Sequence, residues 1–73
     1  MDKVWVYVEE SDNGNDVDIF VTEQEARNRF REKVLAYAGE IVDGLSRYNF
    51  IDGFAYVKEM SYAGALALRE CLC

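Results

Sequence analysis

Apolar and polar residues alternate near the N-terminus, in a segment dense in β-branched and aromatic side chains. Period-two alternation of such residues predicts a β-strand whose neighbouring side chains point to opposite faces. One face, the valine face, contains Val4, Val6 and Val8. The opposite face begins with Trp5 and Tyr7. That face also contains Glu9, so one face is aliphatic and the other combines aromatic residues with an acid.

A turn-forming segment follows, and residues 17–21 predict the returning strand of a hairpin. The dipeptide Asn13-Gly14 is typical of a two-residue turn between antiparallel strands. Counting outward from that loop predicts the cross-strand pairs Val8 with Ile19, Val6 with Val21, Tyr7 with Phe20, and Glu9 with Asp18. This register places the aliphatic residues of both strands on one face, as burial of that face requires.

A helix is predicted over residues 23–43. Thr22 followed by Glu25 three positions later forms a capping box, which is typical of a helix start. Gly44 is a plausible stop signal at the other end. The apolar positions recur every three or four residues, at Ala26, Phe30, Val34, Tyr37, Ala38, Ile41 and Leu45. We expect this stripe to lie across the valine face of the hairpin.

The C-terminal third is less regular. Residues 47–53 read as a connection with a turn at Asp52-Gly53, and residues 54–58 as a third strand. Residues 62–73 have helix-forming residues but also alternate, and we favour a strand because a lone hairpin is a poor floor for a long helix. The predicted fold is a two-layer α+β domain spanning residues 1–73, in the order ββαββ, with ββαβα as the alternative.

Charge and composition limit the kinds of partner that the chain can bind. Fourteen acidic and eight basic residues give a net charge of −6, which argues against direct nucleic-acid binding. The charge favours a basic protein partner, or serves solubility alone. No apolar run is long enough to cross a membrane, and residues 1–3 lead straight into the first strand without a signal peptide. We therefore expect no membrane contact and a cytoplasmic, reducing location.

Catalytic and metal-binding patterns are missing from the sequence. It has no histidine, which removes the commonest general base and metal ligand. Cys71 and Cys73 offer two thiols without a second ligand pair, so one chain cannot close a zinc site. Residues 12–23 suggest a calcium loop, but Val17 stands where that loop requires glycine. We expect no enzyme activity, no metal and no cofactor.

The second face of the hairpin is the candidate partner-binding site. It combines aromatic residues with a stretch, residues 9–25, that contains acids but no lysine or arginine. The candidate residues are Trp5, Tyr7, Glu9, Glu10, Asp12, Asp16, Asp18 and Phe20. Aromatic anchors with a charged rim match the anatomy of protein interfaces. The alternative is that the C-terminal segment or a second copy in a homodimer covers Trp5, Tyr7 and Phe20.

The helix has a basic stretch from Arg27 to Lys33. Such a stretch is usually a solvated face, here within reach of acids in the preceding turn. Its other interpretation is a small RNA-contacting module.

A short acidic chain with an Asn-Gly hairpin, a capped helix and no catalytic set resembles the small anti-defence proteins of phages and mobile elements, including anti-CRISPR proteins. The resemblance is one of type, supported by chain length and the acidic run from Glu9 to Glu25. It carries over no individual positions. It implies an inhibitor whose acidic surface mimics DNA at a nucleic-acid-binding site of a host complex. A structural homo-oligomer and the RNA-contacting module are the alternative functions.

Overall fold

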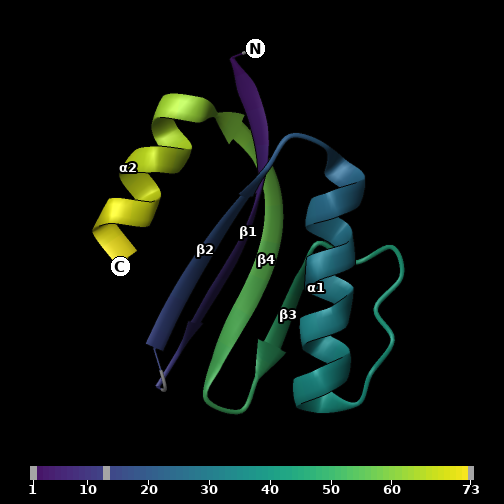
Figure 1. The fold of residues 1–73 in the computed structure, drawn as a ribbon. Coiled ribbons are helices and arrows are strands. Elements are labelled where there is room, and N and C mark those ends of the chain that lie inside the picture. The colour runs from purple at the N-terminus through teal and green to yellow at the C-terminus, as the bar shows by residue number, and fades with distance from the viewer. Residues whose placement is uncertain (1, 13, 73) are drawn as a thin grey trace.

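The computed structural model of the chain describes residues 2–12 and 14–72. Within these residues, two β hairpins occur in succession, each followed by a helix (Figure 1). The elements are β1 (Lys3–Ser11), β2 (Gly14–Phe20), α1 (Glu23–Ala38), β3 (Arg47–Phe50), β4 (Gly53–Ser61) and α2 (Tyr62–Leu72). The predicted α+β class is confirmed, and the order ββαββ holds up to a final helix.

All four strands join one antiparallel sheet in the order β2-β1-β4-β3. The two long strands, β1 and β4, are central and pair along their whole length, from Lys3 opposite Ser61 to Ser11 opposite Gly53. The short strand β3 was not predicted, because residues 47–53 were interpreted as a connection. Its residues Tyr48 and Phe50 alternate with polar ones, which is the period-two signal of a strand.

The N-terminal hairpin has a register two residues away from the predicted one. Val8 pairs with Val17 rather than Ile19, and Glu9 pairs with Asp16 rather than Asp18. Since strand side chains have a period of two, a slip of two residues leaves every side chain on its predicted face. The assignment of faces was therefore correct, and the pairing partners were wrong.

The turn explains the slip. Gly14 is the first residue of β2 and pairs with Ser11, so the loop precedes the glycine instead of containing it. Its φ of 131° is a conformation that residues with a Cβ rarely adopt. The predicted loop residue Asn13 lies outside the described residues. The C-terminal hairpin follows the same plan, because Gly53 opens β4 opposite Phe50 rather than lying within the turn.

Helix α1 begins where predicted and ends five residues earlier than predicted. The Thr22 hydroxyl accepts a hydrogen bond from the Glu25 amide at 3.3 Å and donates one to the Glu25 carboxylate at 2.9 Å. At the other end, Gly39 takes the left-handed conformation, with φ 69°, and donates its amide to the Leu35 carbonyl. Glycine in this position is a common helix stop. Gly39 therefore ends the helix before Gly44 can.

Helix α1 covers the aromatic face of the hairpin, which corrects the expectation that it would cover the valine face. Ala26, Phe30 and Val34 of the helix are buried in one cluster with Tyr7, and Trp5 and Phe20 pack at the edge of that cluster. The rest of the predicted stripe does not reach the core. Tyr37, Ile41 and Leu45 are about half exposed or more, because the helix has ended or turned away from the sheet.

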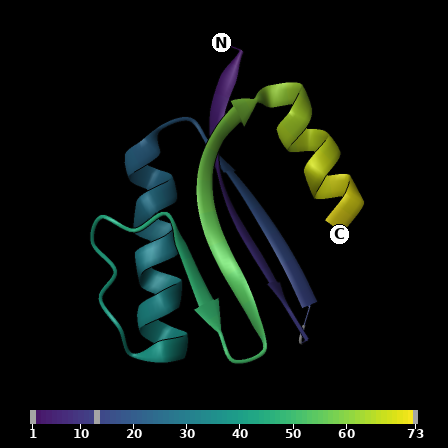
Figure 2. The same ribbon diagram turned by 180° about the vertical axis from the view of Figure 1, so that it is seen from behind.

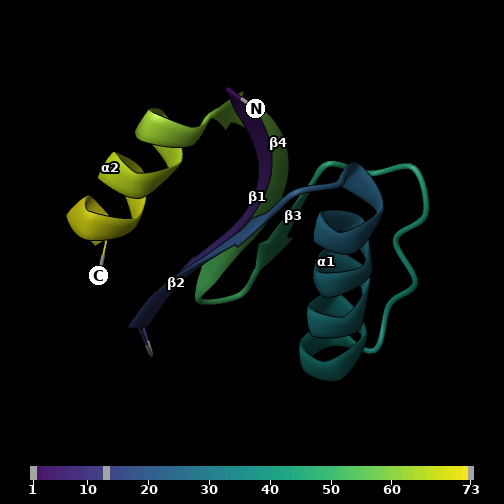
Figure 3. The same ribbon diagram turned by 45° about the horizontal axis from the view of Figure 1, so that its top comes forward.

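Helix α2 corrects the preference for a C-terminal strand and adds a third layer. Its residues Ala65, Leu68 and Leu72, spaced as one helical face, pack on the valine face. The Ser61 hydroxyl accepts the Gly64 amide at 3.0 Å and so caps the helix start. Figure 3 shows the sheet lying between α1 and α2. The surface under α2 comes from β1, β2 and β4, which is broader than a two-stranded hairpin.

The contact between α2 and the valine face can be tested with two matched substitutions. Ala65 is fully buried and Ala67 is exposed on the same helix. Ala65→Asp places a carboxylate against apolar side chains and should lower the free energy of unfolding by about 2 kcal/mol or more. Ala67→Asp should change it by less than about 0.5 kcal/mol. Chemical denaturation of both variants measures the difference, and equal tolerance would show that α2 does not pack there.

Candidate functional site

The aromatic residues of the predicted site are mostly withdrawn from the surface. Tyr7 is fully buried beneath α1, with its ring centroid 6.3 Å from that of Phe30. Trp5 and Phe20 are partly buried, and the Arg27 guanidinium lies 5.9 Å from the Trp5 ring. We expected the aromatic face to be an open surface on the side of the hairpin away from the helix. This expectation is wrong, because α1 covers that face.

The acidic residues of the predicted site separate into two groups. Asp18 lies under α1, where its carboxylate is 3.7 Å from the Arg29 guanidinium. The others gather at one end of the sheet, which we call the acidic end. Its members are Glu9, Glu10, Asp12, Asp16 and Asp52. Glu9 and Asp16 are directly opposed across the ladder, which is an unfavourable pairing of like charges.

The sequence prediction missed Asp52, which belongs to the turn between β3 and β4. The Asp12 amide donates to the Asp52 carbonyl at 3.1 Å and thereby joins the two hairpin turns. Both turns and the C-terminal end of α1 lie at the same end of the molecule (Figure 1, Figure 2). That helix end has no basic residue in its last turn. The partial negative charge of its carbonyls therefore adds to the charge of the carboxylates.

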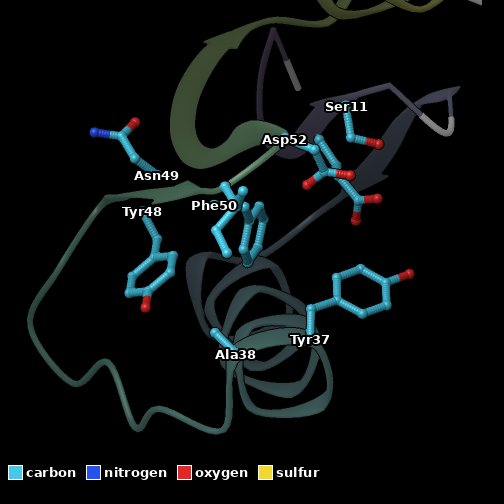
Figure 4. A pocket seen from close by; sticks show the side chains of 9 residues that line it. Ser11, Tyr37, Ala38, Tyr48, Asn49, Phe50 and Asp52 are labelled. Carbon is cyan, nitrogen blue, oxygen red and sulfur yellow. The ribbon is translucent and has the colours of Figure 1, made fainter.

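A groove of about 620 Å³ opens beside the acidic end, and we call it the aromatic groove. Its lining comes from β1, the end of α1, β3 and the following turn. The lining residues are Glu9, Ser11, Tyr37, Ala38, Tyr48, Asn49, Phe50, Ile51 and Asp52. Figure 4 shows Tyr48, Phe50 and Tyr37 in a row across α1, which is seen nearly end-on, with Asp52 and Ser11 grouped above them. The groove thus has an aromatic wall and an acidic rim.

Phe50 contacts the other two rings of the groove, Tyr37 and Tyr48, at steep angles. Phe50 lies 5.9 Å from Tyr37 in an edge-to-face arrangement and 5.3 Å from Tyr48 at 55°. These are favourable aromatic geometries. Tyr37 is nevertheless 57% exposed, and the neighbouring Ile51 is fully exposed. Apolar surface of this kind beside a polar rim is typical of a contact site.

Tyr37 also has a cation beside it. The Lys33 ammonium lies 5.4 Å from the Tyr37 ring centroid and donates to its hydroxyl at 3.4 Å. That hydrogen bond raises the pKa of Lys33 above its ordinary value. The Tyr37 ring therefore already stabilises one positive charge within the molecule.

Buried Tyr7 holds the Glu9 carboxylate at the groove. The Tyr7 hydroxyl donates to Glu9 Oε1 at 2.9 Å. Burial raises the pKa of Tyr7 far above its ordinary value, and the hydrogen bond to Glu9 raises it further. The hydroxyl stays protonated as a donor, so Glu9 is held in place by a side chain fixed in the core.

The basic stretch of α1 is engaged within the chain. Arg27 pairs with Glu23 at 2.7 Å, and Arg31 pairs with Asp43 at 3.1 Å. With Arg29 near Asp18 and Lys33 on Tyr37, the stretch offers a reduced positive charge to an outside anion. The sequence favoured acids of the preceding turn as partners. The partners observed are instead Glu23 of α1 itself, Asp18 of β2 and Asp43 of the loop after α1.

The remaining chemistry of the chain is sparse. Among the described residues, no three side chains of the histidine, cysteine, aspartate or glutamate type gather as metal ligands. Cys71 is a free, exposed thiol, and Cys73 lies outside the described residues. Neither α1 nor α2 is long and apolar enough to cross a membrane. Comparison with family models, curated proteins and solved structures finds no match to this chain.

A double-mutant cycle measures the hold of Tyr7 on Glu9. Tyr7→Phe removes the buried hydroxyl and should cost about 1–2 kcal/mol of stability, since the lost hydrogen bond is to a charged acceptor. In the Glu9→Ala background the same change should cost about 1 kcal/mol less. Urea denaturation of the four proteins gives the coupling energy, and additive effects would show that the two side chains act independently.

A second prediction concerns pH. Burial, and next the charge of Asp16, raise the pKa of Asp18, while Arg29 offsets part of the shift. Asp18 Oδ2 is buried without a hydrogen bond, because 3.7 Å to Arg29 is too long for one. A carboxyl with a raised pKa in the folded state holds its proton more tightly there than in the unfolded chain. The contribution of Asp18 to the free energy of unfolding therefore falls as pH rises from its unfolded-state pKa through its raised folded-state pKa.

Asp18→Asn removes the titrating carboxyl and should therefore remove this decrease in stability with rising pH. The stability of the wild type relative to Asp18→Asn should decrease from pH 3 towards neutral pH, leaving the variant at least as stable at neutral pH. Thermal denaturation across pH provides the measurement, with Asp12→Asn as a control for the loss of one exposed acid. A wild type that gains stability over the variant as pH rises would contradict the prediction.

Proposed function

We propose that this chain is a non-catalytic binding module that engages a basic surface of another protein through its acidic end. The observation that supports this most directly is the union of the two hairpin turns, which brings five acidic residues to one end of the sheet, two of which, Glu9 and Asp52, line the aromatic groove. Exposed Tyr37 and Ile51 supply apolar contact area, while the acids attract and orient the partner.

The charge balance favours this reading over a general solubility role. The arginines of α1 are engaged with Glu23, Asp18 and Asp43, none of which belongs to the acidic end. No lysine or arginine occurs in residues 9–16 or 48–57, which form the two turns and the strand ends beside them. A partner approaching from this side meets an excess of negative charge, reduced in part by Lys33 beside Tyr37, and this excess increases the rate of encounter with a basic surface.

The narrower form of this proposal is an inhibitor that occupies a nucleic-acid-binding site by DNA mimicry, as in anti-CRISPR proteins. Its support is that a surface built to bind a phosphate backbone is basic and would also attract the acidic end. Such a protein acts in the cytoplasm of the host cell, where an exposed thiol such as Cys71 stays reduced. Loss of the partner's nucleic-acid binding on addition of this chain would support this form.

The alternative functions have less support. A homo-oligomer that buries Trp5, Tyr7 and Phe20 between protomers is no longer needed to cover these residues, since α1 packs on them. An RNA-contacting module would have to free the α1 arginines from their acidic partners. Both alternatives are therefore second to the protein-binding module.

Charge reversal at the acidic end tests the proposal. Asp12→Lys with Asp16→Lys should weaken binding to the partner isolated from the native host by about tenfold or more, because steering and pairing are both lost. The matched control, Glu32→Lys with Glu59→Lys, changes the net charge equally at exposed positions away from the two turns. It should alter affinity by less than about threefold.

Affinities are measured by calorimetry at low and high salt, with circular dichroism confirming the fold. Raising the salt should weaken the wild-type complex, since exposed charges are screened beyond about 8–10 Å at physiological ionic strength. Equal affinities of both variants, together with no effect of salt, would overturn the electrostatic mechanism.

A further inference from the structure

We propose that the aromatic groove receives one arginine side chain of the basic partner. This inference rests on the proposed function and specifies what its partner inserts. The groove volume of about 620 Å³ is within the usual range for side-chain and small-ligand sites, and leaves room for the backbone on either side of the arginine.

The aromatic wall suits a flat cation. A guanidinium stacks on aromatic rings and interacts favourably with their electron-rich faces. Tyr37 is 57% exposed, and Phe50 stands edge-to-face with it at 5.9 Å. The molecule already uses the same contact elsewhere, since the Arg47 guanidinium lies 4.4 Å from the Phe54 ring centroid.

The acidic rim suits a donor with several N–H groups in one plane. Glu9 and Asp52 both line the groove, from β1 and from the turn after β3. Glu9 accepts one hydrogen bond from Tyr7 and, as a carboxylate, has further acceptor capacity. A guanidinium can stack on a ring and donate in its own plane to a carboxylate at the same time.

Lysine meets these requirements less well. An ammonium is a compact point charge, has a stronger hold on its water shell and has no planar face to stack. Lys33 also shows where an ammonium of this chain sits, at the Tyr37 hydroxyl and ring. A lysine from a partner would compete for the same tyrosine without the bidentate contact, so we expect arginine to bind more tightly.

Other occupants are disfavoured by charge. An acidic segment would be repelled by Glu9 and Asp52 and by the C-terminal carbonyls of α1. A purely apolar side chain would take water from the carboxylates without replacing its hydrogen bonds, which is costly. A cationic side chain with a flat face can stack on the aromatic wall and pair with the carboxylates of the acidic rim.

The test titrates isotope-labelled protein with N-acetyl-arginine amide and follows backbone amide shifts by NMR. Saturable shifts centred on residues 48–52 are expected, with a dissociation constant in the millimolar range, worth about 4 kcal/mol. N-acetyl-citrulline amide, a neutral analogue of the same shape, should give no saturable shift. N-acetyl-lysine amide should bind at least about threefold more weakly.

Two variants locate the binding site. Tyr37→Ala removes an exposed ring, and Glu9→Gln removes the charge while keeping an acceptor for Tyr7. Each should weaken arginine binding by about fivefold or more, which is of the order of one cation–π or ion-pair contact. Tyr62→Ala and Glu70→Gln, exposed positions on α2, are the matched controls and should leave binding unchanged.

The outcomes separate this inference from the proposed function. No shift, equal shifts with citrulline, shifts centred outside the groove, or binding unaffected by Tyr37→Ala would each overturn the arginine groove. Partner binding that still depends on Asp12 and Asp16 would then leave the proposed function in place. If arginine binds in the groove but binding of the partner does not respond to Asp12→Lys with Asp16→Lys, the proposed function alone is overturned.

Discussion

Tyr7 lies on the central strand β1 with its ring against Phe30 of α1 and its hydroxyl on Glu9. The ring is fully buried, so this one side chain joins the sheet to the helix and ends in a polar contact. A buried hydroxyl needs a partner, and here the partner is a carboxylate at the surface. The Tyr7–Glu9 hydrogen bond therefore links the core to the aromatic groove, and the position of Glu9 depends on how α1 packs.

The distribution of charge follows from the same packing. Because α1 lies over the aromatic face, its arginines come within reach of Asp18 and of the loop after the helix. These contacts use the basic residues away from the acidic end, and β4 brings a further turn with Asp52 next to Asp12. Five of the fourteen acidic residues therefore lie together at one end of the sheet, where the two turns contain no lysine or arginine.

The groove depends on three segments that are far apart in the sequence. Tyr37 comes from the last turn of α1, Phe50 from β3, and Glu9 from β1. Tyr37 was assigned to the core by its helical spacing, yet Gly39 ends the helix soon after it and Tyr37 remains exposed. The residues that form the wall therefore could not be recognised from local pattern, since each is ordinary in its own segment.

Local sequence determined which residues share a strand face, where α1 begins, and that residues 9–18 are strongly acidic. These features follow from a period of two, a capping box and composition, all of which act within a few residues. The tertiary structure alone decided the pairing register, since a slip of two residues preserves both faces. It also decided which helix covers which face.

The valine and aromatic faces of the hairpin are both apolar, so the pattern did not distinguish between them. Packing of Phe30 against Tyr7, and of Ala65 among the valines, made the choice. The helix formed by residues 62–72 likewise depends on contacts with β1, β2 and β4, which are brought together only in the folded sheet. Contacts between elements far apart in the sequence decided which face each helix covers and that residues 62–72 form a helix. A short segment of sequence does not include both partners of such a contact.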